Sequence, residues 1–289
     1  MQDNKNNETK PLSEEEMLKS LKNSAYLLES IMVQKFRQMY FSVETNQVIK
    51  DSFTGKSREI DIIAETYHYE ANTAKLNLAV KITFVCEVKN NLYPVILMTP
   101  YTNSLNGNEE SGLKLANTGQ AHEQGNISDT FYSLSARNYS ELGSKTFTQY
   151  CSFQRKKENK ELMALHPEEF YSGLSKITQY CEENVEFWDR IEIYKTSPSD
   201  NYNRSFLFLP VVIIKDNLME LTIDGGKNQI LNPVPYSRLM FTYHYKETAK
   251  SALVYFVTQS GFDAFVEELL AVRAKAEQFL INKVTSPIS

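Results

Sequence analysis

The sequence predicts an α/β (α+β) domain in which a central mixed sheet is flanked by helices. Three observations support this fold class. A helical repeat of apolar residues comes before several strand-like runs, three further apolar runs lie in the second half, and an amphipathic helical segment follows them. Helices on both sides of a set of strands bury their apolar faces most readily against the two faces of one sheet.

The first predicted element is a helix over residues 13–40. Ser13 and Glu16 have the spacing of a capping box, in which each side chain accepts a hydrogen bond from the other residue's backbone N–H. Apolar residues then recur at helical spacing through Tyr40. They are Met17, Leu21, Leu28, Ile31, Met32, Phe36 and Met39.

A group of strands is predicted next. Residues 41–51, with Val43, Val48 and Ile49, are a predicted strand, and residues 57–64 around Asp61 are the next. Residues 53–56 between them have the composition of a turn. Residues 76–89 give a third strand and residues 93–98 a fourth. The order helix, strand, turn, strand, strand therefore accounts for a core over the first hundred residues.

The middle of the chain changes character. Residues 101–129 are rich in Asn, Gly, Ser and Glu and contain few large apolar residues, so we expect a flexible insertion there. Residues 130–190 are predicted to be mostly helical, above all over 167–188. This pattern gives no sign of an internal repeat.

The last third predicts more sheet and a final helix. Apolar runs at residues 206–214, 238–245 and 253–257 are predicted strands that extend the same sheet, and residues 262–282 form an amphipathic C-terminal helix that packs on it. We therefore predict one domain rather than two. The chain is expected to have a disordered tail at 1–11 and a single domain at 12–289. Within this domain we expect a core at 13–98, the insertion at 101–129 and a sheet extension with the C-terminal helix at 130–289.

Composition narrows the classes of function. The 289 residues carry a net charge of -5, which argues against a protein that coats nucleic acid by bulk electrostatics. No apolar run has membrane-spanning length, so no membrane association is expected. The three cysteines lack metal-ligand spacing and indicate a reducing, cytoplasmic setting. The four histidines likewise show no zinc spacing.

Three charged residues in the predicted strands carry the functional signal. Asp61 lies between Ile60 and Ile62, and a carboxylate in such a strand is costly unless it is paired or binds a metal. Glu87 and Lys89 are two positions apart in a strand and so share one face. Two carboxylates would suit Mg²⁺, which activates water and polarises a phosphate, and an ammonium beside them would stabilise developing charge.

Asp61 and the Glu87-Val88-Lys89 segment, in this order on successive strands, resemble the PD-(D/E)XK, or restriction endonuclease-like, nuclease superfamily. Residues 55–60 are similar to the hairpin that leads into the metal-binding strand of that family. The resemblance covers residues 13–98. It implies a restriction endonuclease-like sheet and Mg²⁺- (or Mn²⁺-) dependent hydrolysis of DNA or, less often, RNA. It also implies Asp61 and Glu87 as metal ligands and Lys89 as the catalytic lysine.

The resemblance points to further residues on helices. Many members carry an acid on the first helix, for which Glu29 is the candidate, although Glu44 and the acids at residues 14–16 compete with it. Members also often carry a Gln and a Tyr on the helix after the Glu-x-Lys strand, and Gln179 and Tyr180 are the candidates. No proline precedes Asp61, but that proline is often absent in the family.

Basic residues could contact a nucleic-acid backbone. Lys56 and Arg58 come just before Asp61 and could hold a substrate phosphate, or they could be solvated turn charges. The cluster Arg155-Lys156-Lys157, near Tyr150 and Phe153, could also grip nucleic acid. A solvated loop or helix end is the commoner outcome for such a run.

The sequence therefore predicts a cytoplasmic, metal-dependent endonuclease that acts on DNA, and the resemblance makes restriction or anti-phage defence its natural setting. A homodimer would allow both strands of a duplex to be cut. The chain has no phosphate-binding glycine loop, so an ATP-driven step would need a partner ATPase. Two rivals stay open: a catalytically inactive module of the same fold that binds nucleic acid or protein, and an RNase. A third reading makes Glu87 and Lys89 an exposed cross-strand pair.

Overall fold

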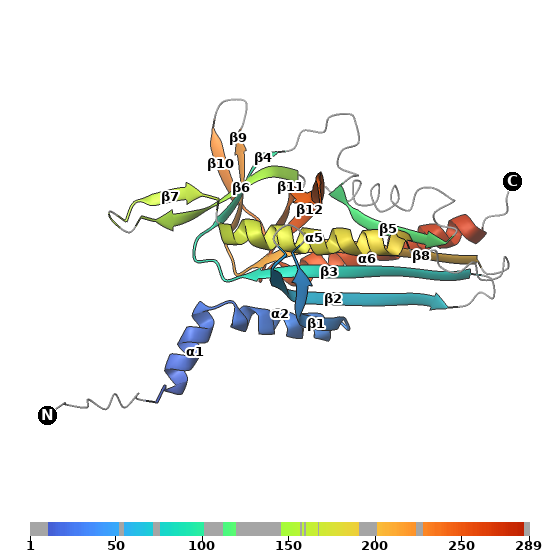
Figure 1. Cartoon of the computed structure of the whole chain (residues 1–289), viewed down its shortest axis with the longest axis horizontal. Helices are drawn as coiled ribbons and strands as arrows, with labels where there is room; N and C mark the ends of the chain where they lie inside the picture. Colours follow the sequence, from blue (N-terminus) through green and yellow to red (C-terminus); the bar gives the residue numbers. More distant parts are fainter. Residues whose placement is uncertain are drawn as a thin grey trace.

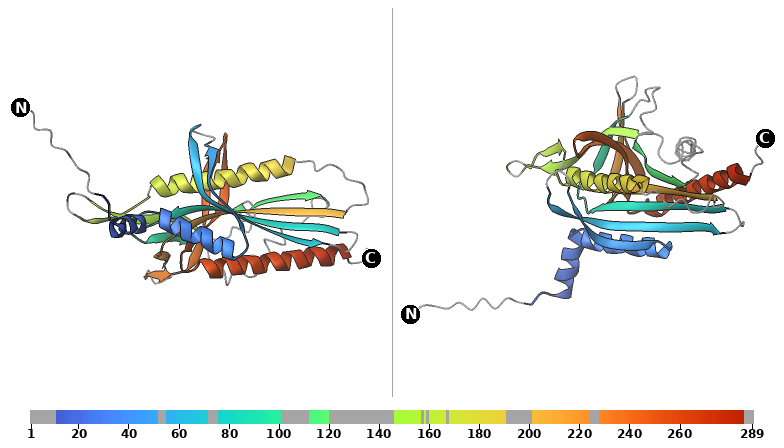
Figure 2. Two further views of the ribbon diagram at one scale, coloured as in Figure 1. Left: turned by 90° about the horizontal axis from the view of Figure 1, so that it is seen from below. Right: turned by 45° about the vertical axis from the view of Figure 1, so that its right-hand side comes forward.

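The computed structural model describes residues 11–51, 55–71, 76–100, 112–119, 146–156, 158, 160–166, 168–190, 201–223 and 228–285. The described chain is a mixed α/β structure with one 12-stranded sheet and four helices. The sheet lies between α5 (Glu168–Arg190) on one face and α2 (Tyr26–Gln38) with α6 (Phe262–Thr285) on the other (Figures 1 and 2). The predicted coarse fold class is therefore confirmed.

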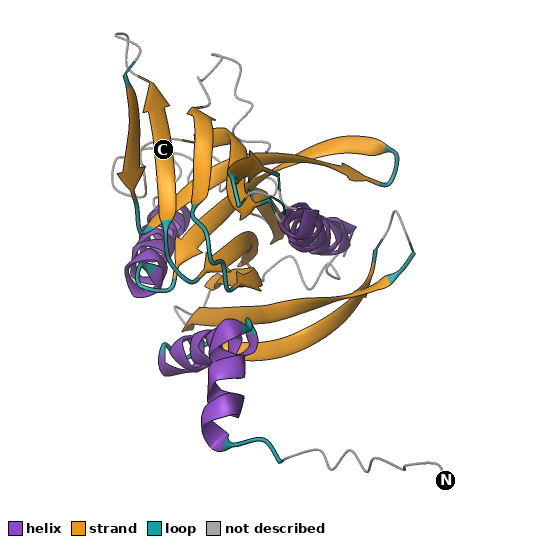
Figure 3. Ribbon diagram, turned by 90° about the vertical axis from the view of Figure 1, so that its left-hand side faces the viewer, coloured by secondary structure: helices purple, strands orange, loops and turns teal. Residues whose placement is uncertain are grey.

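The predicted first helix is two helices, α1 (Glu14–Asn23) and α2. The capping box is present, since Ser13 Oγ accepts from Glu16 N at 3.2 Å and Ser13 N donates to Glu16 Oε2 at 2.9 Å. Ser24 ends α1, where both its N–H and its hydroxyl donate to the Leu21 carbonyl. Helix α1 buries no residue and projects from the body of the molecule (Figures 1 and 3). The prediction of one continuous helix was wrong at this serine.

Three antiparallel strands follow: β1 (Ser42–Lys50), β2 (Ser57–Ala71) and β3 (Leu76–Lys89). The next strand in the sheet is β8 (Asn201–Ile214), which pairs with β3 in parallel along its whole length. Helix α5 comes before β8 in the chain and covers the face of the sheet opposite to α2 and α6. The order α2–β1–β2–β3–α5–β8 therefore forms the central part of the fold.

The rest of the sheet continues from β8 in the order β12-β11-β6-β4-β9-β10. The strands are parallel where β12 meets β8, β11 meets β6 and β4 meets β9, and antiparallel at the other neighbours. Figure 3 shows the strong twist between the two ends of the sheet. The bounds are β4 (Val95–Pro100), β6 (Thr146–Arg155), β9 (Leu218–Ile223), β10 (Gln229–Pro233), β11 (Tyr236–Tyr245) and β12 (Thr248–Thr258).

Two short strands lie where sequence patterns predicted something else. Strand β5 (Lys114–Gly119) pairs with β8, so the described part of the expected flexible insertion at 101–129 belongs to the sheet. Strand β7 (Leu162–Leu165) forms a hairpin with β6, so the helical prediction for 130–190 holds for α5 and is wrong for this hairpin. The remainder of 101–129 lies outside the described residues.

The core has two layers, one on each face of the sheet. Phe84, Cys86 and Val88 of β3 pack with α2 and α6, whereas Val85 between them packs under α5. Rings of Phe36, Phe41, Phe84 and Phe262 meet at centroid distances of 4.8–5.4 Å in the first layer. Cys86 is buried there, as expected for a packing residue. Among the described helices, none is long and apolar enough to cross a membrane.

Candidate active site

Asp61 lies at a distortion of strand β2. Ile60 packs under α5 while Ile62 packs on the opposite layer, so the alternation of the strand breaks between them. Opposite this point in β1, Asn46 has a positive φ of 56° between the paired residues on either side. The Asp61 carboxylate turns toward β3 and its Oδ2 accepts a hydrogen bond from Val88 N at 2.7 Å. The distortion thus brings Asp61 to the Glu-x-Lys segment.

Glu87 and Lys89 share the face of β3 that α5 covers. Lys89 Nζ lies 2.7 Å from Glu87 Oε1, and the Glu87 side chain is buried. The alternation of the strand places both residues on this face, as the sequence predicted. The reading of Glu87 and Lys89 as an exposed cross-strand pair was wrong, because Glu87 is 5% exposed.

A second lysine, Lys176 of α5, completes the cluster. Its Nζ contacts Glu87 Oε2, lies 3.5 Å from Asp61 Oδ1 and donates to the Glu59 carbonyl. Both acids therefore surround one ammonium. Sequence reasoning missed Lys176. The available signal was a lysine on the face of an amphipathic helix whose neighbours in sequence, Leu174 and Ile177, are buried.

Gly173 lets α5 approach Glu87 closely. A Cβ at this position would lie 2.8 Å from Cγ, Cδ and Oε1 of Glu87. Real Cβ contacts are essentially never that short, so any side chain here would push the carboxylate out of its place. The glycine is therefore required by the packing of helix against strand at the cluster.

We expect Gly173→Ala to displace the Glu87 carboxylate while changing the stability of the fold little. Ala gains about 1 kcal/mol of helix propensity, which offsets part of the steric cost. Displacement of Glu87 by about 1 Å can lower a catalytic rate about 10²-fold. Thermal unfolding measures the effect of the substitution on the fold, and an assay of the cleavage that the resemblance implies measures its effect on the site. A variant with unchanged activity would show that Glu87 moves without consequence.

The electrostatics of the cluster favour an added cation. Burial raises the pKa of Asp61, the charge of Glu87 raises it further, and Lys176 and the Val88 N–H lower it. Burial also raises the pKa of Glu29 of α2, and the charges of Asp61 and Glu87 act in the same direction. The charges of both acids of the cluster thus act on Glu29 from across the α2 packing.

Replacement of Glu29 by Gln should stabilise the metal-free protein at neutral pH. The raised pKa means that the folded state binds the Glu29 proton more tightly than the unfolded state does. The stabilisation that this proton gives to the fold is present at low pH and is lost as pH rises through the folded pKa. The free energy of unfolding of the variant should exceed that of the wild type by up to about 1 kcal/mol at pH 7–8, which is the scale for partly exposed charges. Near pH 4 the two proteins should be equally stable. Denaturation in EDTA across this range, beside the exposed Glu267→Gln, measures it. A gain that did not depend on pH would contradict the electrostatic cause.

The donor set fits a hard divalent cation. Asp61 and Glu87 supply carboxylate oxygens, and Glu87 Oε2 is shielded from solvent and accepts no hydrogen bond of normal geometry, so Lys176 contacts it as an ion pair only. Mg²⁺ is commonly held by one or two carboxylates, with waters and substrate oxygens completing its shell. Within the described ranges, no three His, Cys, Asp or Glu side chains are already arranged around a common metal position.

The predicted phosphate-binding residues are engaged elsewhere. Arg58 Nε lies 2.6 Å from Asp51 Oδ2, and Arg58 Nη1 donates to Ser172 Oγ at 2.5 Å, so this side chain ties β2 to α5. Lys56 is exposed just before β2. The structure brings Arg58 next to the cluster through Ser172 but gives it protein partners.

The second basic group lies in the β6–β7 hairpin. Arg155 Nη1 donates to the Lys160 carbonyl at 3.0 Å, and Lys156 Nζ lies 2.9 Å from Glu161 Oε2. Lys157 is outside the described residues. Arg155 and Lys156 are exposed at this hairpin, which fits the alternative of a solvated loop.

Gln179 and Tyr180 lie one helical turn beyond Lys176. Gln179 is buried, and Tyr180 is partly buried with a pKa raised by that burial. The charges of Glu65 and Glu44 also raise the pKa of Tyr180. The described α5 residue that contacts Asp61 and Glu87 is Lys176, one turn earlier.

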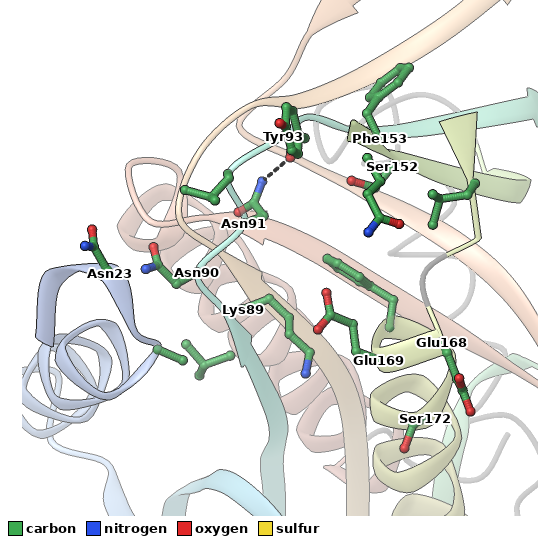
Figure 4. A pocket seen from close by; sticks show the side chains of 16 residues that line it. Asn23, Lys89, Asn90, Asn91, Tyr93, Ser152, Phe153, Glu168, Glu169 and Ser172 are labelled. Atoms are coloured by element: carbon green, nitrogen blue, oxygen red, sulfur yellow. Dashed lines mark hydrogen bonds between the residues drawn. The ribbon is translucent and has the colours of Figure 1, made fainter. Parts of the chain in front are cut away.

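A cavity of about 920 Å³ opens beside Lys89 (Figure 4). Its walls come from the β3–β4 connection, the β6–β7 hairpin, the start of α5 and the α1–α2 junction. In Figure 4 the Lys89 side chain runs toward the first turns of α5, where Glu169 and Ser172 lie. The other lining residues include the amides and rings of Asn23, Asn90, Asn91, Gln154, Tyr93, Phe153 and Phe170.

The chain matches no protein-family model, and comparisons with curated proteins and with solved structures gave no match. The geometry of the cluster and the cavity beside it must therefore carry any functional argument.

Proposed function

We propose that this chain is a metal-dependent endonuclease of the PD-(D/E)XK type that hydrolyses phosphodiester bonds in DNA. One observation carries the proposal: Asp61, Glu87 and Lys89, chosen from the sequence alone, converge on one small region. Asp61 and Glu87 contact the same Lys176 nitrogen, and Lys89 contacts Glu87. A chance motif on two strands would have no reason to converge in this way.

The order of elements supports the same assignment. The resemblance implies elements in the order helix, three strands, helix and strand. The elements α2, β1, β2, β3, α5 and β8 have this order, and β8 is parallel to β3. Asp61 is on the second of these strands and Glu87 and Lys89 are on the third.

The residues divide the chemistry between them. Asp61 and Glu87 would hold Mg²⁺ or Mn²⁺, which supplies Lewis-acid activation of the phosphate and a lowered pKa of the attacking water. Lys89 is free to act on substrate because its ammonium has three donors and only one of them is needed for Glu87. It can orient the water or stabilise negative charge as it develops on the phosphate.

The cavity beside Lys89 is a suitable place for the nucleotide next to the scissile phosphate. It has the size of a small-molecule site, and Lys89 lines both the cavity and the carboxylate cluster. The rings of Tyr93 and Phe153 offer surfaces on which a base can stack. The amides of Gln154 and Asn90 offer donors and acceptors for base edges.

A catalytically inactive module is the second candidate, and one observation favours it. Lys176 neutralises both carboxylates in an ion-paired cluster, which a purely structural site would also show. Against this, a buried ion-pair cluster is seldom better for stability than apolar packing, so stability alone gives weak grounds for retaining three charged side chains here.

A substrate panel tests the proposed function. Supercoiled plasmid, single-stranded DNA and structured RNA are incubated with the protein in Mg²⁺ or Mn²⁺, with EDTA as the control. Cleavage of DNA that stops in EDTA supports the proposal, and cleavage of RNA alone would turn it toward an RNase. An absence of both cleavage and metal binding by calorimetry would leave the inactive module.

A further inference from the structure

The Lys176 ammonium occupies an oxygen cage. Three oxygens from separate sources surround its nitrogen: Glu87 Oε2, Asp61 Oδ1 and the Glu59 carbonyl oxygen. The ammonium donates a hydrogen bond to the Glu59 carbonyl, and the two carboxylate oxygens contact it as ion pairs. Two of these oxygens belong to the carboxylates to which the proposed function assigns the metal. The lysine and the metal therefore share ligands.

The position of Lys176 is imposed by the fold. Gly173, one turn earlier on α5, allows the helix to lie against Glu87, and Lys176 is about 90% shielded from solvent. Burial strengthens the attraction between charges, because the effective dielectric constant there is far below that of water. An unpaired pair of buried carboxylates would be costly, and the ammonium removes most of that cost.

We infer that Lys176 is a tethered cation that fills the divalent-metal position in the metal-free protein and is displaced from the two carboxylates when the metal binds. This inference rests on the proposed function, since it concerns the same carboxylates. The Glu59 carbonyl gives the displaced ammonium a remaining acceptor on β2, so the lysine need not leave the site. Metal binding then competes with an intramolecular ion pair and is weaker than two bare carboxylates would allow.

The inference predicts opposite effects of one substitution on metal affinity and on stability. Lys176→Met removes the competing charge, so the affinity for Mn²⁺ measured by calorimetry should rise at least about tenfold. The same variant should have a lower Tm without metal, because Asp61 and Glu87 lose their cation. Saturating Mn²⁺ should close the Tm difference from the wild type, because the metal replaces the missing charge. Lys176→Gln, which keeps a donor for the Glu59 carbonyl, is the second variant if Met prevents folding.

The chain offers a matched control in a buried lysine of β5 that pairs with the same helix. Lys114 is as buried as Lys176 and its Nζ lies 2.6 Å from Glu182 Oε2 of α5, away from Asp61 and Glu87. Lys114→Met should also lower the Tm, but the loss should not be reversed by Mn²⁺, and the Mn²⁺ affinity should equal that of the wild type.

The outcomes separate the inference from the proposed function. Tighter Mn²⁺ binding by Lys176→Met or Lys176→Gln, with recovery of the Tm, supports the inference. Equal or weaker binding than a wild type that does bind Mn²⁺ overturns the inference and leaves the proposed function standing. A wild type that neither binds Mn²⁺ nor cleaves any substrate overturns both.

Discussion

Asp61→Asn should abolish metal-dependent cleavage while leaving the fold intact. The amide oxygen of Asn can still accept the hydrogen bond from Val88 N that Asp61 Oδ2 accepts at 2.7 Å, so the contact between β2 and β3 survives. The charge needed to hold a divalent cation is lost. Because a bound metal contributes several kcal/mol to a transition state, the rate should fall by at least about 10³-fold.

Stability should move little, or in the favourable direction, in this variant. The pKa of Asp61 is raised by burial and then by Glu87, which means that the ionised form costs folding free energy at neutral pH. Asn removes that cost but also removes a partner of Lys176. On the same sample, circular dichroism measures the fold, chemical denaturation measures the stability and calorimetry measures the Mn²⁺ affinity. A variant that binds Mn²⁺ as well as the wild type would exclude Asp61 as a ligand.

Lys89→Met should lower the cleavage rate about 10²–10³-fold, the usual loss when one group that stabilises transition-state charge is removed. Lys89 contacts Glu87 at 2.7 Å and lines the cavity, so it can reach a substrate phosphate. The proposed metal ligands Asp61 and Glu87 remain in this variant, and Mn²⁺ should still bind. The expected result is therefore a fall in kcat with metal affinity kept, which distinguishes Lys89 from Asp61.

The same strand supplies a control for this lysine. Lys81 of β3 is buried, whereas Lys89 is partly buried, and Lys81 Nζ lies 2.6 Å from Glu65 Oε1, away from Glu87. Lys81→Met removes a lysine with a comparable ion pair from the same strand. It should cost stability and leave kcat unchanged at a temperature where the variant is folded. A loss of kcat in both variants would point to a general effect on the sheet.

The sequence predicts the part of the site that lies within short segments. Alternation along residues 82–89 places Glu87 and Lys89 on one face because the side-chain period of a strand is two. Asp61 stands out because it interrupts an apolar strand. These local signals need no knowledge of the rest of the chain, and the structure brings the three residues together.

Lys176 could not be assigned to the site from local pattern. It is 87 positions beyond Lys89, and only the packing of α5 across β2 and β3 brings it to Asp61 and Glu87. The close approach at Gly173 is equally non-local, since a glycine within a helix predicts nothing about its neighbour on another element. The pattern of α5 can mark Lys176 as a lysine on the buried face, but the residues that it contacts depend on long-range packing.

The errors in the fold have local causes. Ser24 closes α1 with two hydrogen bonds to Leu21, and a single serine within a helical repeat is a weak signal for such a break. Strand β7 has only four residues, none of them fully buried, so it lacks the alternation that would reveal a strand. Strand β5 has six residues and pairs with residues of β8 that are 84 to 94 positions later in the chain.

The most direct test of the proposed nuclease compares three proteins purified in the same way: the wild type, Lys89→Met and Lys81→Met. Cleavage of supercoiled plasmid in Mg²⁺ is followed over time, with EDTA added to a parallel sample. The account predicts that the wild type and Lys81→Met cleave at similar rates, that EDTA stops both, and that Lys89→Met is at least about 10²-fold slower. Equal cleavage by all three proteins, or none by the wild type together with an absence of Mn²⁺ binding, would contradict it.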